Sequence, residues 1–245
     1  MSGDNPLGTI LGIWAHPDDE TWLCAGLMAR AARAGDRVVC VTATRGELGS
    51  PDEERWPSGA PLAAVRTAEM ERGLAVLGVT EHHWLDYPDG GCADVDQDEA
   101  VRRVTALMAE VQPDTVLTFG PDGMTGHDDH KAACRWATAA FTAVAPPGAV
   151  LGYATNSPEW LEEFREPLDR FNVFMGSEPP CTPRDEQLFS LRLEGELLET
   201  KLAAISSMTS QVEPLIAGLG LDFFRRGLIE ESFRQGPDRR RASTT

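Results

Sequence analysis

Histidines and acidic residues gather in two short clusters of this 245-residue chain. The first is His16–Glu20 (HPDDE), and the second is Gly126–His130 (GHDDH). Imidazole nitrogens and carboxylate oxygens bind zinc and other divalent ions, and a hydrolytic zinc site needs about three protein ligands. Each cluster follows an apolar, strand-like run, and ligands bind at the carboxyl ends of strands in open α/β sheets. The clusters therefore predict one metal site that the fold assembles.

The residue types suggest a role for each member of the first cluster. His16 and Asp19 lie three positions apart across a predicted strand-to-helix turn, so both can face one point. His130 of the second cluster completes a His-Asp-His set of metal ligands. Asp18 lies beside the ligands without having to bind the metal, and a carboxylate in that position can take a proton from water. We therefore expect Asp18 to be the general base.

The second cluster also offers catalytic groups that do not bind the metal. His127 is expected to stabilise an oxyanion and then to protonate a leaving amine. Asp129 is expected to orient His127, as carboxylates beside metal sites do, and a cap for the following helix is its alternative role. The pair Asp19–Glu20 also suits a plain helix N-terminus. The presence of both clusters at two strand ends favours the metal site.

Strand-like and helix-like segments alternate through the first 155 residues. This alternation predicts a single-domain, Rossmann-like α/β fold, with a mostly parallel sheet and helices on both faces. Strands are expected at residues 9–15, 37–43, 81–85, 114–119 and 149–154, and helices at 20–34, 62–77, 98–111 and 129–141.

The last ninety residues show a less regular pattern. Residues 158–183 are expected to be irregular with a short strand at 171–175, and 194–209 to form a helix. The domain is expected to span 1–234, and the polar segment 235–245 to be a disordered tail.

Composition limits the classes of partner. A formal net charge of −17 argues against nucleic acid and anionic membrane surfaces as partners. It says little about the substrate, because a metal site can be locally positive in an acidic protein. The expected partner is a small-molecule N-acylated substrate. The five cysteines are far apart, as is typical of reduced thiols in a cytoplasmic protein. We see no signal peptide and no apolar run of about 20 residues, so a cytoplasmic location is expected. The oligomeric state, including a homo-oligomer, stays open.

Two motifs resemble those of a known family. Ala15–Glu20 (AHPDDE) matches the first motif of the LmbE/PIG-L family of zinc-dependent N-acetylglucosaminyl deacetylases, the superfamily of mycothiol-biosynthesis-type deacetylases. Gly126–His130 resembles the second motif, usually GHPDH, with Asp128 in place of proline. Thr44–Gly49 (TRGELG) is similar to a family loop between them. The resemblance covers about residues 9–155.

The resemblance implies a complete set of site residues. Its zinc ligands are His16, Asp19 and His130, its general base is Asp18, and its acid partner His127 is oriented by Asp129. It also implies that Arg66 and Asp89 bind a sugar-like substrate; a surface helix charge and a Pro-Asp-Gly turn are their alternative roles. Met208 stands where the family often has a histidine, and this departure bears on the substrate.

These observations predict a metal-dependent hydrolase that removes an N-acyl group, with N-acetyl expected, from an aminosugar-type substrate. Asp18 would activate a zinc-bound water; Fe²⁺ and other divalent metals stay open as cofactors. The alternatives are an amidase for a non-sugar or thiol-conjugate amide, a sugar-binding module without catalysis, and a non-haem iron oxygenase that uses His16, Asp18 and His130. The first strand-to-helix turn lacks GxGxxG, which argues against dinucleotide binding.

Overall fold

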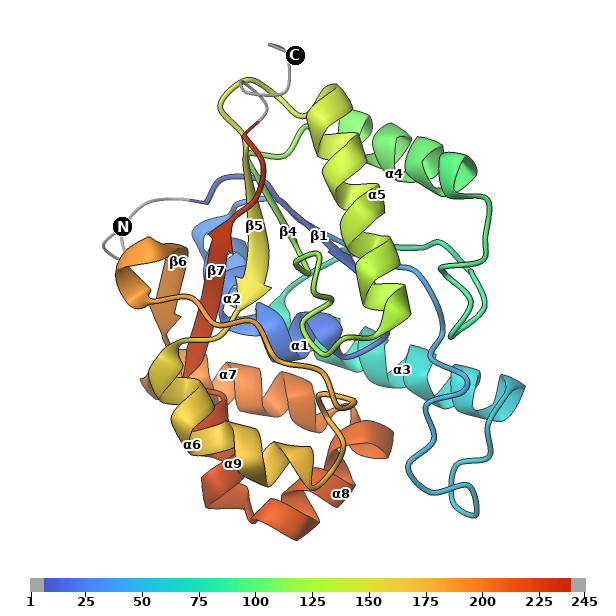
Figure 1. Cartoon of the computed structure of the whole chain (residues 1–245), viewed down its shortest axis with the longest axis vertical. Helices are drawn as coiled ribbons and strands as arrows, with labels where there is room; N and C mark the ends of the chain where they lie inside the picture. Colours follow the sequence, from blue (N-terminus) through green and yellow to red (C-terminus); the bar gives the residue numbers. More distant parts are fainter. Residues whose placement is uncertain (1–6, 239–245) are drawn as a thin grey trace.

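A seven-stranded sheet forms the centre of the computed structural model, which describes residues 7–238 (Figure 1). The strand order is β3-β2-β1-β4-β5-β7-β6. The first five strands in this order are parallel, while β7 pairs antiparallel with both β5 and β6. The strands are β1 (Ile10–Trp14), β2 (Val38–Thr42), β3 (Glu81–Trp84), β4 (Thr115–Thr118), β5 (Val150–Thr155), β6 (Gln187–Arg192) and β7 (Glu230–Gln235). The expected mostly parallel α/β sheet is confirmed.

Helices cover both faces of this sheet. In Figure 1, α4 and α5 lie together on one side and α2 lies on the other, where it contacts α3 and α7. All residues of β1, β2 and β4 are buried, as expected for parallel strands that are covered on both faces. The helices are α1 (Asp19–Leu23), α2 (Ala25–Ala34), α3 (Ala60–Leu77), α4 (Gln97–Val111), α5 (Asp128–Val144), α6 (Pro158–Asp169), α7 (Gly195–Ser206), α8 (Thr209–Leu219) and α9 (Leu221–Gly227).

Three expectations for residues 20–183 are wrong in detail. The helix expected at 20–34 is divided at Cys24, whose φ of −147° is not helical. The segment expected to be irregular begins with α6, because the Ser157 side chain accepts a hydrogen bond from the Trp160 backbone and Pro158 suits the first helical turn. Residues 171–175 form turns instead of the expected strand.

The C-terminal part contains elements that local patterns did not predict. The expected helix at 194–209 is α7 followed by a separate α8, and α9, β6 and β7 were not expected. Gln235 is the last residue of β7, and the Gly236 backbone donates to Leu151, so the structured part extends past the expected boundary at 234. The remainder of the expected tail, 239–245, lies outside the described residues. Within residues 7–238, no helix is long and apolar enough to cross a bilayer.

A buried ion pair joins the N-terminal and C-terminal parts of the fold. The Lys201 ammonium lies 2.9 Å from the Glu231 carboxylate and donates to the Trp22 carbonyl at 2.7 Å. Glu231 also accepts the backbone N–H groups of Gly26 and Leu27 at the start of α2. A negative charge is favourable at a helix N-terminus, so Glu231 connects β7 to α2 while Lys201 connects α7 to α1.

Replacing Lys201 with methionine should destabilise the protein by about 3 kcal/mol, because the buried Glu231 carboxylate would lose its partner cation. Urea denaturation measures this change. The double variant Lys201→Met, Glu231→Gln should recover part of the loss, since it removes the buried charge as well. A loss below about 1 kcal/mol in the single variant would show that the pair contributes little.

Candidate active site

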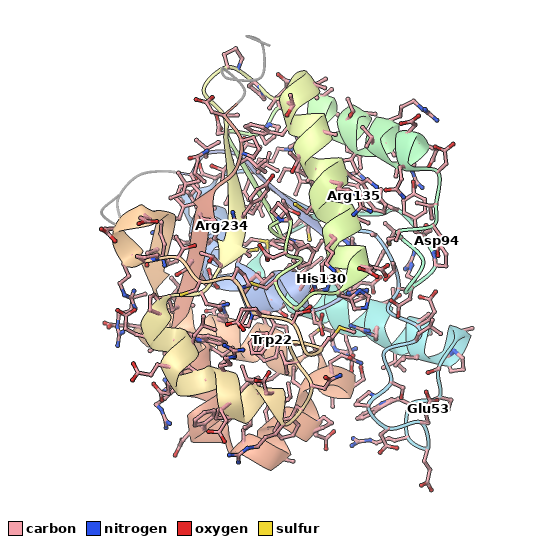
Figure 2. The ribbon with its side chains drawn as sticks, in the orientation of Figure 1. Trp22, Glu53, Asp94, His130, Arg135 and Arg234 are labelled. Atoms are coloured by element: carbon pink, nitrogen blue, oxygen red, sulfur yellow. The ribbon has the colours of Figure 1, made fainter. Side chains whose placement is uncertain are left out.

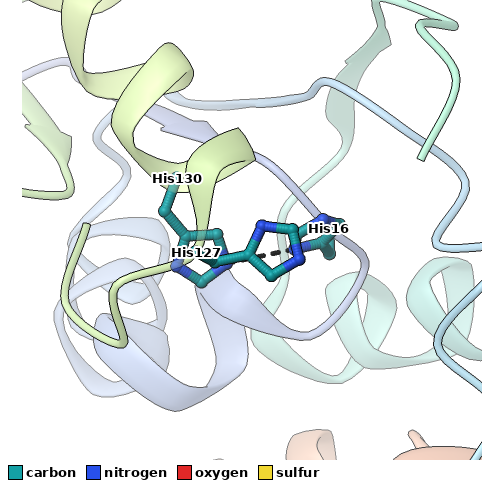
Figure 3. Close-up of side chains that lie close together, drawn as sticks. All are labelled: His16, His127 and His130. Atoms are coloured by element: carbon teal, nitrogen blue, oxygen red, sulfur yellow. Dashed lines mark hydrogen bonds between the residues drawn. The ribbon is translucent and has the colours of Figure 1, made fainter. Parts of the chain in front are cut away.

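The two sequence clusters meet where the strand order reverses direction. The chain leaves β1 for β2 and β3 on one side and later returns to β4 on the other side of β1. Ligands bind at such a switch point, beyond the carboxyl ends of the strands. His16 follows β1, while His127 and His130 follow β4 and start α5 (Figure 3). The fold therefore brings together residues more than a hundred positions apart.

Ring nitrogens of two histidines face each other in this site. His16 Nδ1 lies 3.1 Å from His130 Nε2, the contact dashed in Figure 3. The other nitrogen of His130 lies 2.9 Å from the Gly123 carbonyl, and the other nitrogen of His16 lies 3.2 Å from the Asp129 carboxylate. Both partners are hydrogen-bond acceptors, so each can hold a proton on the ring nitrogen that points away from the His16–His130 contact. With the ring protons held there, a cation between the two facing nitrogens would satisfy this arrangement.

The Asp19 carboxylate provides a third donor atom beside the two facing histidine nitrogens. Its Oδ1 lies 3.4 Å from His130 Nε2, and its Oδ2 accepts the backbone N–H groups of Ala15 and His16 at 3.1 and 2.7 Å. Ligands about 2.0–2.1 Å from a tetrahedral zinc lie about 3.3 Å from each other. The separations of 3.1 and 3.4 Å among these donor atoms fit such an ion.

The electrostatics of the site favour a positive charge there. Burial lowers the pKa of His16, but the carboxylates of Asp129, Asp89 and Asp19 outweigh this effect and raise the pKa to about 10. Burial lowers the pKa of His130 to about 4, so that ring stays neutral. The carboxylates around His16 stabilise a positive charge at this point, and a divalent cation bound there would take the place of the His16 proton.

Asp18 lies at the start of α1 in a strained conformation. Its φ is 121°, which side-chain-bearing residues rarely adopt and which costs about 1–3 kcal/mol. Its Oδ2 lies 3.4 Å from Arg66 Nη2. Burial raises the pKa of Asp18 to about 7 against the opposing charge of Arg66, and the neighbouring Asp19 adds to the increase. This carboxyl group therefore binds a proton more tightly than one in water, as suits a proton acceptor.

His127 occupies the N-terminal cap of α5. Its Nδ1 accepts the backbone N–H of Asp129 at 3.1 Å, so in the neutral ring the proton is on Nε2. Burial, and then the charge of His16, lower the pKa of His127. The ring centroids of His127 and His16 are 4.7 Å apart. His127 is thus a neutral hydrogen-bond donor beside the candidate metal ligands.

The Asp129 carboxylate contacts both the His16 ring and the loop of residues 90–92. Beyond the His16 contact, it accepts the backbone N–H groups of Gly90 and Cys92 at 2.7 and 2.9 Å. The backbone N–H of Asp129 donates to His127 Nδ1. The sequence led us to expect that the Asp129 carboxylate orients His127, but in the structure that carboxylate contacts His16, and only the Asp129 backbone N–H contacts His127.

Arg66 is buried and points from α3 into the site. Its guanidinium donates to the carbonyls of Gly46 at 2.9 Å and Pro17 at 2.7 Å. Gly46 has a φ of 65°, and a Cβ atom at this position would collide with the guanidinium. This collision explains why the TRGELG loop needs glycine there. The surface-charge alternative for Arg66 is therefore wrong.

Asp89 is also buried and does more than form a turn. Its Oδ1 lies 3.1 Å from His16 Nε2, and its Oδ2 accepts the backbone N–H of Leu48 at 2.8 Å. Burial raises the pKa of Asp89, but the His16 contact outweighs it and holds the pKa well below its usual range. Asp89 and Asp129 thus share one imidazole nitrogen.

These groups line a cavity of about 640 Å³. The cavity includes every sequence-predicted site residue except Asp129, which lies behind His16. Asp128 points to solvent and pairs with Lys131, and Met208 is buried against Gly73 of α3, so neither contributes to the cavity lining. Sequence reasoning missed the apolar wall, which comes mainly from α1, α8 and the 160–175 segment. Trp160, Phe164 and Leu168 follow one another at intervals of four residues, and this helical spacing is the sequence signal for α6.

Fold and site together define an α/β protein with a candidate hydrolytic metal centre at the strand switch point. A family model described as PIG-L, GlcNAc-PI de-N-acetylase, matches residues 11–141. The chain therefore belongs to the PIG-L family.

Curated relatives match over different lengths. A 1D-myo-inositol 2-acetamido-2-deoxy-alpha-D-glucopyranoside deacetylase of Saccharomonospora viridis is 30% identical over 236 residues, covering 83% of this chain and 85% of the relative. A deacetylase of the same name from Kineococcus radiotolerans is 36% identical over 148 residues, covering 49% of this chain and 41% of the relative. The match thus spans about half the length of the first curated relatives.

Solved structures share the fold at low sequence identity. The N,N'-diacetylchitobiose deacetylase of Pyrococcus horikoshii has a TM-score of 0.63 at 24% identity, covering 96% of this chain and 86% of that one. The 4-carboxy-2-hydroxymuconate hydratase of Pseudomonas putida has a TM-score of 0.61 at 19% identity, covering 94% and 97%. Since deacetylases and a hydratase share the fold, the reaction must be argued from the site.

Proposed function

We propose that this protein is a zinc-dependent N-deacetylase that acts on an N-acetylated amino sugar. The observation that carries the proposal is the convergence of His16 Nδ1, His130 Nε2 and Asp19 Oδ1 at separations of 3.1 and 3.4 Å, with Asp18 and His127 lining the same cavity. The names of the curated relatives supply the substrate class, an acetamido sugar.

The proposed ligands are His16, Asp19 and His130. When bound, zinc supplies Lewis-acid chemistry, since it polarises the amide carbonyl and lowers the pKa of the attacking water. Asp129 and Asp89 hold the ring of His16 through its Nε2, and the Gly123 carbonyl holds His130. These contacts keep the donor nitrogens directed at one point.

The remaining residues handle the proton and the developing charge. Asp18 accepts a proton from the attacking water, whose oxygen forms a bond to the carbonyl carbon. His127 donates its Nε2–H to the oxyanion that develops on the carbonyl oxygen. The carbon–nitrogen bond then breaks as the proton that Asp18 took from water passes to the nitrogen, which gives a free amine and acetic acid, and the acid ionises to acetate by losing its own proton to solvent. Arg66 holds the Asp18 carboxylate in place.

Arg66 and Asp89 were expected to bind the substrate, and both already have partners within the protein. Arg66 donates to two backbone carbonyls and faces Asp18, and Asp89 contacts His16 and Leu48. Both also line the cavity. We propose that they shape the sugar site mainly by holding these catalytic and loop groups.

Removal and return of the metal test the proposal. Treating the protein with a chelator should abolish amine release from N-acetylglucosamine and its inositol glycoside, and one equivalent of zinc should restore it. Fe²⁺ in place of zinc tests the identity of the metal. Unchanged activity after the metal content falls to zero would contradict the proposal. A zinc-loaded protein that releases no amine from the sugars but hydrolyses another amide would move the function to a non-sugar amidase.

A further inference from the structure

Exposed apolar side chains gather at the mouth of the cavity. Leu48 is 63% exposed, Met175 is 51% exposed and Phe171 is 37% exposed, and all three line the cavity. Among residues 7–238, they make up three of the five large apolar side chains that are exposed to this degree. Single exposed apolar residues are ordinary, but a cluster around one opening indicates a binding surface. We refer to Leu48, Phe171 and Met175 as the apolar rim.

The apolar surface continues inward from the rim. Trp22 and Leu215 line the same cavity, and Trp22 lies on α1, three residues after Asp19. Figure 2 shows Trp22 between His130 and the group of helices α6, α8 and α9. An apolar path therefore leads from the candidate catalytic groups to the opening.

A small apolar cluster supports the segment that carries Phe171 and Met175. Phe164, Leu168 and Phe174 form a buried cluster separate from the main core. The Phe171 ring packs against the backbone of Gly218 on α8, where a Cβ atom would collide with it. The segment that carries Phe171 and Met175 is thus packed on this cluster and on α8, so this part of the rim is formed before a ligand arrives.

The charges of the cavity disfavour an anionic occupant at the rim. The acidic residues that line the cavity are Asp18, Asp19, Asp89, Glu230 and Glu231. Arg66 is the one Lys or Arg side chain among the lining residues that the structure describes, and it is engaged by Asp18 and two backbone carbonyls. A phosphate or carboxylate at the mouth would meet no free cation, whereas an uncharged group would meet apolar surface.

From these observations we infer that the apolar rim binds an uncharged alkyl or aryl substituent on the sugar side of the substrate. This inference rests on the proposed deacetylase function. The amide must reach His16 and His130 at the floor, so the part of the substrate farthest from the amide crosses the mouth. The substrate class is therefore an N-acetylated amino sugar with an apolar aglycone.

Rates on a series of glycosides test the inference. The series is the methyl, butyl, octyl and phenyl glycosides of N-acetylglucosamine, used below micelle-forming concentrations. A fully buried methylene changes binding about fourfold and a half-buried one about twofold, so kcat/KM should increase at least about tenfold from methyl to octyl. An octyl glycoside that ends in a carboxylate, and N-acetylglucosamine 1-phosphate, should be poorer substrates than the neutral octyl compound.

Rim variants with a matched control separate the subsite from general damage. Leu48→Asn and Met175→Asn should each lower the octyl-to-methyl ratio of kcat/KM by about threefold or more, chiefly through KM. Asparagine tolerates the φ of 49° at Met175. Leu221 is 52% exposed but does not line the cavity, so Leu221→Asn should leave the ratio unchanged.

The outcomes distinguish this inference from the proposed function. Hydrolysis of the methyl glycoside with no increase along the series would overturn the inference alone. Faster hydrolysis of an N-octanoyl amide than of the octyl glycoside would place the acyl chain at the rim and overturn it too. If the zinc-loaded protein hydrolyses none of the compounds, the proposed function fails, and calorimetric binding of the octyl and methyl glycosides decides whether the rim still prefers the apolar one.

Discussion

Replacing Asp18 with asparagine is expected to lower kcat/KM by a factor of about 10²–10⁴ while zinc stays bound, because a general base typically contributes this much. The amide keeps the size of the carboxylate but cannot accept a proton at neutral pH. The metal donors of His16, Asp19 and His130 are untouched by the change. Steady-state rates combined with zinc content by atomic emission measure both parts of the prediction.

A matched carboxylate offers the control for this experiment. Asp128 lies in the second motif, but its side chain points to solvent and pairs with Lys131. Asp128→Asn should therefore leave both activity and zinc content unchanged. If Asp18→Asn loses zinc together with activity, Asp18 is a metal ligand and another group is the base. If it keeps full activity, the proposed base is wrong.

Replacing His130 with alanine is expected to reduce zinc affinity by more than about 100-fold and to abolish activity. Even loss of a residue that only orients a ligand typically costs 10–100-fold in metal affinity, so loss of one of three proposed ligands should cost more. His130 faces both His16 and Asp19, at 3.1 and 3.4 Å. Zinc titration with a competing chelator measures the affinity directly.

Thermal stability provides a readout of this change that does not depend on activity. A ligand that binds only the folded protein raises the melting temperature, so zinc should stabilise the wild type and fail to stabilise His130→Ala. His83→Ala is the control, because His83 lies on β3 and not in the cavity lining. Normal zinc affinity in His130→Ala would remove His130 from the ligand set. Circular dichroism establishes that each variant is folded.

The two carboxylates that contact His16 connect this ring to other parts of the site. Asp89 and Asp129 come from different parts of the chain, yet both contact the same imidazole nitrogen. Asp129 additionally holds the 90–92 backbone, and Asp89 holds the backbone of Leu48. The proposed metal ligand and the proposed apolar rim are therefore connected through Asp89 and the Leu48 backbone.

The sequence by itself determined the class of fold and which residues meet in the candidate site. Clusters of imidazoles and carboxylates at strand ends are local features, and the alternation of apolar periodicities identifies strands and helices without any knowledge of packing. The parallel sheet, its helical cover and the residues of both clusters could be predicted for this reason. The mostly apolar β1, β2 and β4 had clear boundaries because burial on both faces gives continuous apolar runs.

Only the tertiary structure decided how these residues are connected. The contact of Asp129 with His16 and the burial of Arg66 under the glycine loop depend on separations of 113 and 20 positions, which no local pattern encodes. The strands β6 and β7 lie at the antiparallel edge of the sheet, and their pairing depends on long-range register. The apolar rim combines Leu48 with Phe171 and Met175, which lie more than a hundred positions further along the chain, so this surface forms only when the chain folds.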